Sequence, residues 1–283
     1  MNTTSSFKRV WMITGASRGI GARIAAAALA HGDAVVATAR NAVAIEQRFG
    51  VQADLLATSL DVTDEAQAAQ AVRAALERFG RIDVLVNNAG YGLMGAVEEA
   101  SADEVRRVYE TNVFGLLNVT RAVLPQMRER RSGHVINISS IGGYRSAAGF
   151  GVYCSTKFAV EGLTEALHDE LAPLGIHATV VEPGYFRTDF LENQSLVTSP
   201  RQLADYAGTA GRVREIAGQI SLNQLGDPER LAQAMLKLVS AKTPPLRLPM
   251  GTDTLKAIAD KNAVVERETA EWHELAASTD FPA

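Results

Sequence analysis

Residues Thr14-Gly15-Ala16-Ser17-Arg18-Gly19-Ile20-Gly21 follow a short apolar run and open an alanine-rich stretch that stops at Gly32. Glycines let a backbone approach phosphate groups closely, and the start of a helix offers N–H groups and a positive dipole to an anion. The spacing is G-x3-G-x-G, which differs from the G-x-G-x-x-G of another dinucleotide-binding turn. A structural turn would also explain a glycine cluster, but the strand-like run before it and the helical stretch after it favour a pyrophosphate site.

Outward from this turn, short apolar runs alternate with longer segments of helical character. The runs expected to form strands are residues 10–14, 34–38, 58–62, 84–87, 135–139 and 178–182, with a weaker one at 246–248. Most are continuously apolar, which is typical of parallel strands that helices cover on both faces. Acidic residues after Thr63 and the capping-box spacing of Ser101 and Glu104 indicate helix starts. The sequence therefore predicts one α/β domain over residues 1–283, with a doubly wound, seven-stranded parallel sheet of Rossmann type.

Two segments toward the end of the chain depart from this alternation. Residues 186–226 show no clear strand and mix Ser, Thr, Gly and Asn with scattered apolar residues. An insertion of this length in a compact domain is usually functional, so we expect a substrate-binding lid there. Residues 252–277 have the pattern of one polar helix whose acidic and basic residues are interspersed, which suits an exposed or subunit-facing position.

The composition argues against several other classes of protein. Apolar residues make up 47% of 283, the formal net charge is −4, and no run of Lys or Arg suggests a nucleic-acid or anionic-membrane partner. Cys154 has no second cysteine to pair with, and the five histidines show no metal-ligand spacing. No apolar stretch reaches the roughly 20 residues of a membrane span, and no signal region follows the polar N-terminus. We expect a cytoplasmic protein that acts on a small molecule without a metal.

Further motifs follow the glycine-rich turn in order. They are Asn87-Asn88-Ala89-Gly90, Asn112, Asn137-Ile138-Ser139-Ser140, Tyr153-x-x-x-Lys157, and Pro183-Gly184 followed by Thr188. Together with TGxxxGxG, and over residues 10–188, they resemble the short-chain dehydrogenase/reductase family; beyond residue 188 the resemblance is generic. It implies an oxidoreductase that moves a hydride between a nicotinamide cofactor and a carbonyl/alcohol pair. Residues 36–40, the stretch PGYFRTDF at 183–190 and the long C-terminal helix resemble the steroid- and retinol-active branch.

The resemblance implies a catalytic set of Asn112, Ser140, Tyr153 and Lys157. Tyr153 and Lys157 are four residues apart and so share a helix face. A free tyrosine has a pKa of about 10, and we expect the Lys157 ammonium and a positive nicotinamide to lower it, so that Tyr153 acts as general acid and base. Ser140 would hold the substrate oxygen, and Asn112 would position a water that relays protons to Lys157. Ser139 is the alternative serine, but its side chain should point the other way on a strand.

Cofactor choice is indicated by the end of the second strand, where no acidic residue follows and Arg40 stands. A carboxylate there would select NAD(H), whereas Arg40 and Arg18 would clamp the 2′-phosphate of NADP(H). NADP(H) is therefore the preferred cofactor, with NAD(H) possible and with two surface arginines as the alternative. The resemblance implies that the cofactor also contacts Gly15, Ser17, Gly19, Ile20, Gly21, Asp61, Val62, Asn88, Ala89, Gly90, Tyr153, Lys157, Pro183, Gly184, Phe186 and Thr188.

The substrate is not specified by these motifs. The residues expected to line its pocket are Tyr91, Ile141, Gly142, Phe150, Tyr185, Phe186, Phe190 and Leu191, although several could simply pack the lid. They are mainly apolar and aromatic, which favours a lipophilic ketone. A non-catalytic NADP-binding regulator and an NAD-dependent relative are the alternatives. The resemblance also implies a homodimer or homotetramer built on the helices that carry Asn112 and Tyr153, with Val113, Leu117 and Leu124 facing outward.

Overall fold

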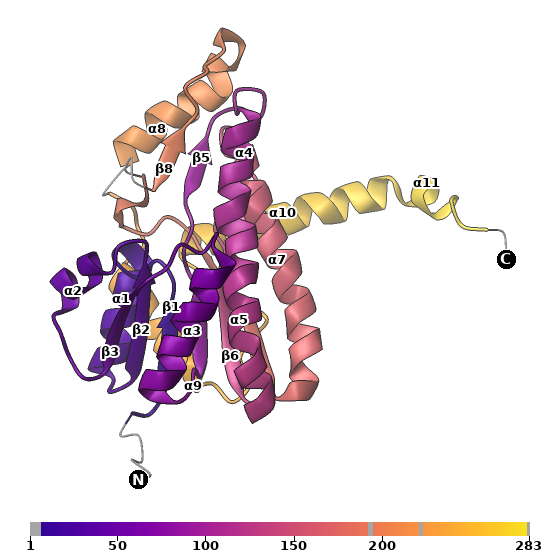
Figure 1. Cartoon of the computed structure of the whole chain (residues 1–283). Helices are drawn as coiled ribbons and strands as arrows, with labels where there is room; N and C mark the ends of the chain where they lie inside the picture. The colour runs from indigo at the N-terminus through magenta and orange to yellow at the C-terminus, as the bar shows by residue number, and fades with distance from the viewer. Residues whose placement is uncertain (1–6, 192–194, 221–222, 282–283) are drawn as a thin grey trace.

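The computed structural model describes residues 7–191, 195–220 and 223–281, so the polar stretch 1–6 lies outside it. Seven parallel strands form the main sheet in the order β3-β2-β1-β4-β6-β7-β9. They are β1 (Val10–Ile13), β2 (Ala34–Ala39), β3 (Leu55–Ser59), β4 (Val84–Asn87), β6 (Gly133–Ile138), β7 (Ile176–Pro183) and β9 (Arg247–Met250). The strand order reverses between β1 and β4, which opens a crevice at their carboxyl ends. The predicted doubly wound sheet is confirmed (Figure 1).

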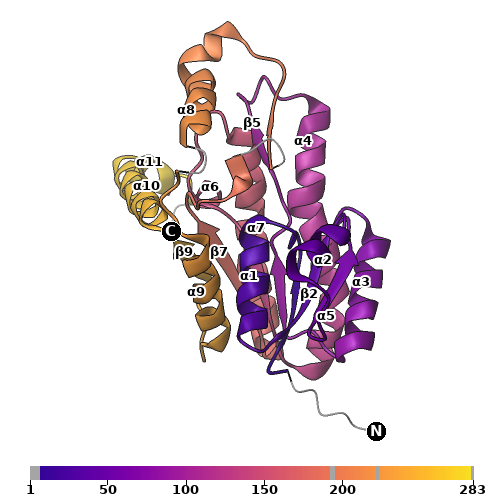
Figure 2. The same ribbon diagram turned by 90° about the vertical axis from the view of Figure 1, so that its left-hand side faces the viewer.

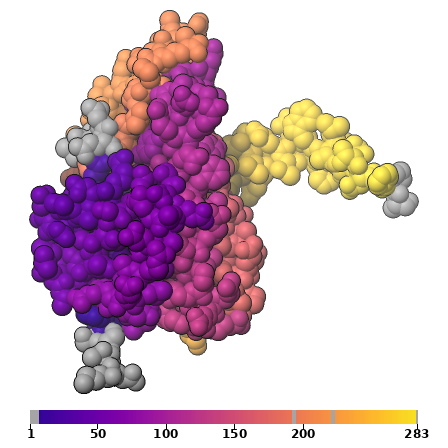
Figure 3. Space-filling model, in the orientation of Figure 1, coloured from indigo at the N-terminus to yellow at the C-terminus, as the bar shows by residue number. Residues whose placement is uncertain are grey.

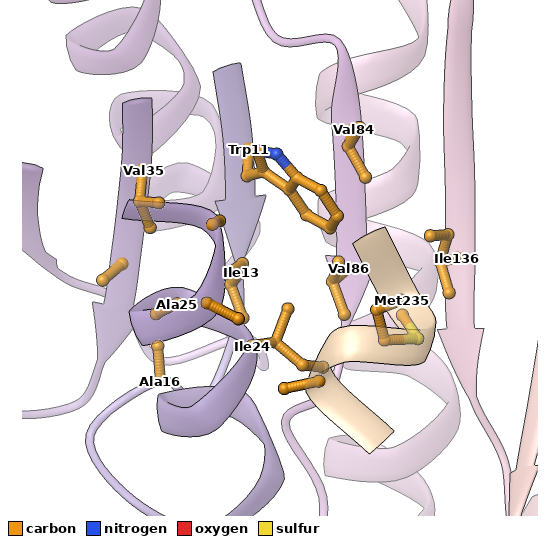
Figure 4. Packing of buried hydrophobic residues seen from close by; sticks show 14 of the residues in the cluster. Trp11, Ile13, Ala16, Ile24, Ala25, Val35, Val84, Val86, Ile136 and Met235 are labelled. Atoms are coloured by element: carbon orange, nitrogen blue, oxygen red, sulfur yellow. The ribbon is translucent and has the colours of Figure 1, made fainter. Parts of the chain in front are cut away.

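Helices cover both faces of the sheet, as the continuously apolar strands predicted (Figure 2). On one face lie α1 (Gly19–Ala30) and α9 (Pro228–Ser240); on the other lie α3 (Glu65–Phe79), α5 (Gly115–Arg130) and α7 (Gly151–Leu171). The core is divided accordingly, because neighbouring residues of β1 point to opposite faces. Trp11 and Ile13 pack with α1 and α9, as Figure 4 shows, whereas Val10 and Met12 pack with α3 and α5. Short helical segments complete this part of the fold: α2 (Val43–Phe49), α6 (Ile141–Tyr144) and η2 (Ala172–Leu174).

The helix starts that the sequence indicated are present. The Asp64 side chain accepts hydrogen bonds from the backbone N–H groups of Ala66 and Gln67 at the start of α3. Ser101 and Glu104 form a reciprocal capping box at the start of α4 (Ala102–Tyr109). Each pairing satisfies N–H groups that the first turn of a helix leaves without an intrahelical acceptor.

The third strand lies earlier in the chain than predicted. The expected strand was 58–62, but β3 pairs with β2 from Val35↔Leu55 to Ala39↔Ser59 and ends there. Leu60 and Val62 are nevertheless buried, because the turn after β3 packs them into the core beside α3 and α5. The apolar residues at 58–62 therefore indicated burial and not a strand.

A π-helical turn, η1 (Glu110–Phe114), interrupts the single helix that was expected to carry Asn112. It joins α4 to α5 and adds width to the turn in which Asn112 lies, and such insertions often occur at functional sites. Val113 is 6% exposed, so its expected outward position was wrong. Leu117 and Leu124 are only partly exposed, and Phe114 is the apolar residue of this turn that faces solvent, at 48% exposure.

The lid contains more regular structure than its sequence suggested. Its strand β8 (Leu196–Thr198) pairs in parallel with β5 (Gly92–Met94), which the sequence analysis also missed. The lid further contains η3 (Asp189–Leu191), η4 (Ala204–Tyr206), η5 (Ala207–Gly211) and α8 (Arg212–Ile220). Together with β5 and the start of α4 these elements form an upper lobe above the sheet (Figure 1). Residues 192–194 and 221–222 of the predicted lid lie outside the described residues.

The C-terminal segment forms two helices rather than one. Helix α10 (Thr252–Glu271) ends at Trp272, whose φ of −103° and ψ of 11° leave the helical range, and α11 (His273–Ala277) follows. The first turns of α10 pack on the body, where Thr254 and Ala257 are buried. The remainder extends away from the body, as Figure 3 shows, and from Asn262 onward its described residues are exposed. No helix in the described ranges is both long enough and apolar enough to cross a membrane.

Candidate active site

A cavity of about 1290 Å³ opens where the strands of the main sheet end. Residues that directly follow β1, β2, β3, β4, β6 and β7 line it, together with the start of α1, part of α7 and the lid. Every residue predicted to contact the cofactor lines this cavity except Gly21, and so do Ser140 and all the predicted substrate-lining residues. Asn112 does not line it. The topology therefore gathers motifs that lie up to about 170 residues apart in the sequence into one hollow.

Two glycines of the turn adopt backbone conformations that other residues rarely adopt. Gly15 has a φ of +65° and Gly19 a φ of +56°. Gly21 lies inside α1, where a Cβ would come within 2.6 Å of the Gly15 carbonyl oxygen and 2.4 Å of Asn88 Nδ2. Gly21 therefore allows close packing and does not line the cavity. Arg18, the residue before α1, forms no side-chain capping hydrogen bond with the helix. The N–H groups of the first turn can therefore bind an anion.

The segment after β4 is hydrogen-bonded to the glycine turn. Thr14 Oγ1 accepts from the backbone N–H of Asn88 (3.0 Å) and of Ala89 (2.9 Å), and Asn88 Nδ2 donates to the carbonyl oxygens of Thr14 and Gly15. These bonds fix the distance between the two segments at the switch point of the sheet. A cavity wall made of two backbone segments held this rigidly fits the flat, extended shape of a dinucleotide.

The two arginines predicted to select NADP(H) both line the cavity. Arg18 Nη2 donates to Ser195 Oγ (2.8 Å), and its Nε lies 3.6 Å from Asp189 Oδ2, so this guanidinium contacts the lid. Arg40 follows β2 and is exposed. Asp61 Oδ1 accepts from the N–H and the hydroxyl of Thr63, which orders the turn after β3.

The Tyr153 hydroxyl group meets Ser140 inside the cavity. Tyr153 is 8% exposed, and burial raises its pKa well above the ordinary value, although a hydrogen bond with the Ser140 side chain lowers it. Burial of the phenol therefore outweighs the hydrogen bond that favours its ionised form. The lowering expected from Lys157 together with a positive nicotinamide stays a prediction. Ser140 also accepts a hydrogen bond from the Gly142 N–H (3.0 Å), which fixes its hydroxyl at the start of α6.

Lys157 lies one helical turn after Tyr153, with its Nζ 5.9 Å from the centre of the Tyr153 ring. The Nζ donates to the carbonyl oxygen of Ile138 (2.8 Å), and the side chain is buried. Burial lowers the pKa of Lys157 to about 8, and the Glu161 carboxylate opposes that shift. The Lys157 ammonium can therefore lose its proton at a lower pH than an ordinary lysine.

Asn112 braces the backbone beside the cavity. Its Oδ1 accepts from Tyr91 N (3.0 Å), and its Nδ2 donates to Tyr91 O (2.9 Å) and to Thr156 Oγ1 (3.1 Å). A Cβ on Gly90 would lie 3.0 Å from Asn112 Oδ1 and 3.8 Å from Lys157 Nζ, so Gly90 passes between the two side chains. The observed contacts position Tyr91; the water relay predicted for Asn112 stays a prediction.

Ser139, the alternative serine, and Cys154, the neighbour of Tyr153, do not meet the Tyr153 hydroxyl as Ser140 does. The Ser139 hydroxyl lies toward Glu161, away from the Ser140 hydroxyl, as strand alternation predicted. Cys154 is buried against Gly142, and burial raises the pKa of its thiol, so thiolate chemistry is not favoured.

Aromatic rings surround the Tyr153 side of the cavity. The ring centres of Phe150 and Phe190 lie 6.2 Å and 5.9 Å from that of Tyr153. Beyond β7, Asp253 of α10 accepts from the Tyr185 N–H (2.7 Å) and occupies the space that a Cβ on Gly184 would need. The predicted carboxamide-binding segment at Pro183 is thus anchored by a residue from the C-terminal helix.

Sequence reasoning missed several lining residues. They include Arg107, Arg145, Ser146, Ala147, Ser195, Gln224 and Ala257. Arg145, Ser146 and Ala147 lie between two recognised motifs, and their proximity to Tyr153 was a usable signal. Ser195, Gln224 and Ala257 come from the lid and α10, where no motif or periodicity marks single positions.

The comparisons with known proteins agree with this geometry. A family model described as short chain dehydrogenase matches residues 9–197. Oxidoreductase BOA17 of Botryotinia fuckeliana is 40% identical over 270 residues, covering 94% of this chain and 97% of its own. The 3-ketodihydrosphingosine reductase of Bacteroides thetaiotaomicron is 39% identical over 243 residues (86% and 88%). Retinol dehydrogenase 8 of Bos taurus is 34% identical over 270 residues (89% and 85%).

Solved structures show the same likeness. A short-chain dehydrogenase from Streptomyces avermitilis has a TM-score of 0.88 at 42% identity, covering 96% of this chain and 100% of that chain. A serine dehydrogenase complexed with NADP+ has a TM-score of 0.72 at 30% identity (85% and 94%). The 3-ketoacyl-(acyl-carrier-protein) reductase of Brucella melitensis, complexed with NADH, has a TM-score of 0.73 at 29% identity (87% and 97%).

Proposed function

The chain belongs to the short-chain dehydrogenase family, and on this premise we propose that it interconverts a lipophilic ketone or aldehyde and the alcohol with NADP(H). Membership makes it an oxidoreductase of alcohol/carbonyl pairs; the cofactor preference and the substrate class are the proposal. One observation carries it. Tyr153 and Ser140 meet at an aromatic-walled part of a cavity that Arg18 and Arg40 also line.

The bound nicotinamide would supply or accept the hydride, and the residues of this chain perform the remaining steps. Tyr153 gives its hydroxyl proton to the substrate carbonyl oxygen in reduction and takes a proton from the alcohol in oxidation. Ser140 donates to the same oxygen as negative charge develops on it. The Lys157 ammonium lies on the same helix face and favours the ionised phenol that proton donation leaves behind.

The cofactor would lie along the segments that end the strands. Gly15, Ser17 and Gly19 would face the pyrophosphate, and Asn88 to Gly90 would pass beneath the adenosine ribose. The fit rests on the positive φ angles of the turn and on the absence of a side-chain cap at the start of α1, among the residues described. Pro183 and Thr188, which also line the cavity, would contact the nicotinamide.

A lipophilic substrate is supported by the character of the wall around Tyr153. The cavity is lined by Phe150, Phe190, Leu191 and Ile141. The ring centres of Phe150 and Phe190 lie 6.2 Å and 5.9 Å from that of Tyr153. Binding of an apolar ligand is favoured here, because its apolar surface is buried against this wall. Retinol and 3-ketodihydrosphingosine, which appear in the names of two relatives, are both lipophilic compounds.

The preference for NADP(H) is supported by the positive charge of two arginines that line the cavity. The structural neighbours include complexes with NADP+ and with NADH, so the likeness alone leaves both open. Here Arg40 and no carboxylate follows β2, and Arg18 lines the same cavity. Two guanidinium groups suit a 2′-phosphate and offer no acceptor to a free 2′-hydroxyl.

The proposed chemistry is tested with a panel of ketones and alcohols, NADPH and NADP+, and the substitution Tyr153→Phe. This change should lower kcat by about 10²–10⁴-fold on a substrate found in the panel, because the proton donor is lost. The dissociation constant for NADPH, measured by fluorescence, should hardly change. The control is Tyr206→Phe, which removes a hydroxyl bonded to Glu98 outside the cavity. A Tyr153→Phe enzyme that keeps most of its kcat would refute the assigned role.

The cofactor preference is tested by Arg40→Asp, which removes a phosphate partner and supplies an acceptor for the 2′-hydroxyl. In the wild type, kcat/KM should favour NADPH by roughly tenfold to a thousandfold, since each charged hydrogen bond contributes about 1.5–3 kcal/mol. The variant should move this ratio toward NADH, and high salt should weaken the wild-type preference. Arg48→Asp makes the same charge change at an exposed residue of α2 outside the cavity. Equal kcat/KM values for the two cofactors in the wild type would contradict the assignment.

A further inference from the structure

A group of charged side chains lies behind Lys157, and we call it the carboxylate cluster. It consists of Glu161 and Glu165 of α7, Glu182 of β7 and Arg247 of β9. Arg247 Nη1 donates to Glu161 Oε2 and, at 2.9 Å, to Glu182 Oε1, while Nη2 donates to Glu165 Oε1. Glu161 is 4% exposed and Glu182 is fully buried, whereas Glu165 reaches the surface. Two buried carboxyl groups therefore share one guanidinium.

Arg247 and the Ser139 hydroxyl are the donors that lie beside the buried carboxylate oxygens of the cluster. Within the described part of the chain, Glu161 Oε1 and Glu182 Oε2 are buried and receive no hydrogen bond from Arg247. A Cβ on Gly143 would lie 2.3 Å from Ser139 Oγ and 2.8 Å from Glu161 Oε1, so these two oxygens border one small space. Two ionised carboxylates side by side repel each other, and a single proton between them both removes the repulsion and supplies a donor.

The cluster is connected to the reaction centre through α7. Tyr153, Lys157 and Glu161 follow each other at intervals of four residues, so they share one face of the helix. The Glu161 carboxylate favours the charged form of Lys157. Ser139 precedes the catalytic Ser140 and approaches Glu161 from β6. The negative charge of Glu161 therefore interacts with Lys157 in a buried environment, where screening by water is weak.

We infer that Glu161 is a positioning residue of the proposed reaction: it holds a proton against the Glu182 carboxylate and, once that proton is lost, keeps Lys157 in its ammonium form. This inference rests on the proposed function, because it assigns Lys157 a part in that reaction. The cluster thus widens the pH range in which Tyr153 can be recharged with a proton.

The order of proton release follows from the surroundings of each group. Burial, and to a smaller extent the neighbouring Glu182, raise the pKa of Glu161 to about 7. The Ser139 side chain and the Arg247 guanidinium act against this shift. Burial lowers the pKa of Lys157 to about 8. As the pH rises, Glu161 loses its proton first, and the new negative charge then opposes loss of the Lys157 proton. The charged and titratable groups that face Glu161 are Lys157, Glu165, Glu182 and Arg247; Tyr144 of α6 lies next to Arg247, and Lys261 of α10 lies on the Tyr144 ring.

The first experiment compares pH profiles of kcat/KM for carbonyl reduction in the wild type and in Glu161→Gln. The glutamine keeps the shape of the side chain and an acceptor for Arg247 but carries no charge. The alkaline limb should move to lower pH by about one unit, because the charge that retained the Lys157 proton is gone. Glu161→Asp should restore the limb. Glu165→Gln, which contacts the same guanidinium at the surface, should leave it in place; equal shifts in the two glutamine variants would overturn the inference.

The second experiment needs no catalysis. In protein labelled with ¹³C and ¹⁵N, NMR titration follows the Glu161 carboxyl carbon and the Lys157 side chain. The wild-type Glu161 should titrate well above the ordinary carboxyl range, and Lys157 should titrate lower in Glu161→Gln than in the wild type. An ordinary Glu161 titration in the wild type overturns the inference even if the variant does not fold. Absence of any oxidoreductase activity would instead refute the proposed function, and the two failures are therefore distinct.

Discussion

The cavity has two walls of different construction: the glycine-turn wall, residues 10–21 with 87–91, and the lid wall, residues 186–226. In the first, all four residues of β1 are buried, and β1 pairs with β2 on one side and β4 on the other. In the second, β8 pairs with β5 in a two-stranded sheet, and two of its three residues are exposed. The glycine-turn wall is specified by apolar burial and close backbone packing, whereas the lid wall depends on a few polar contacts.

One of those polar contacts is Glu99, which is 1% exposed although it follows β5 near the surface. Its carboxylate accepts from Ala96 N (2.8 Å), from Leu203 N (2.9 Å) and from Arg214 Nη1 (2.7 Å). The last two donors belong to the lid. A single carboxylate therefore joins the lid to the loop after β5, and the difference between the walls predicts different responses to substitution.

The largest effect is expected in the glycine-turn wall from Gly21→Ala. The new Cβ would overlap the Gly15 carbonyl oxygen, which belongs to the backbone and cannot move aside without opening the turn. The free energy of unfolding should fall by about 1–3 kcal/mol, as for overpacked cores, and should be measured by urea denaturation. The control, Gly162→Ala in α7, meets no atom within 4 Å and should raise stability by about 0.5–1 kcal/mol. Equal effects of the two substitutions would remove the contrast that we draw.

A smaller and more local effect is expected in the lid wall from Arg214→Met. The change keeps most of the length of the side chain but leaves the Glu99 carboxylate without its guanidinium partner. Hydrogen exchange at residues 203–219 should become faster, while β1 and β4 keep their protection. Arg201→Met is the matched control, because Arg201 is exposed and lies 3.9 Å from the exposed Glu98. Faster exchange in β1 together with the lid would show that the two walls unfold as one unit.

The smallest effect is expected from acid alone. The Arg214 hydrogen bond, with those of Leu203 and Ala96, lowers the pKa of Glu99 from its ordinary 4.5 to about 2. A lowered pKa contributes stability that is present above the ordinary value and is lost as the pH falls through the folded value. The lid should therefore loosen between pH 4.5 and pH 2. Brief digestion with pepsin in this range should cut first within 203–219; cuts that begin in β1 or β4 would contradict it.

Much of the glycine-turn wall could be predicted from the sequence, because burial and backbone shape leave direct traces there. The strand β4 was predicted to the residue, and the turn residues Gly15 and Gly19 have the positive φ angles that a glycine cluster suggests. The displaced β3 shows the limit of that signal. Leu60 and Val62 are apolar because they are buried, and burial alone does not distinguish a strand from the turn that follows it.

Other features could not be predicted because they depend on contacts between distant segments. β5 and β8 have three residues each and become strands only by pairing with each other. The π-helical turn leaves no periodic signal, so Val113 was assigned to the wrong face. Glu99 and Asp253 resemble ordinary surface acids in the sequence, and only the folded chain shows which N–H groups they accept from.

Helix α10 has one further consequence, which concerns helical phase. Asp253 holds Tyr185 at the end of β7, and Ala257, one turn later, lines the cavity. One residue inserted between Gly251 and Asp253 would rotate everything after it by about 100° and carry both side chains off the face they occupy. The same insertion after Asn262, where the described residues are exposed, would rotate only exposed side chains. We therefore expect α10 to tolerate insertions after Asn262, whereas the number of residues between Gly251 and Ala257 determines which side chains face the cavity.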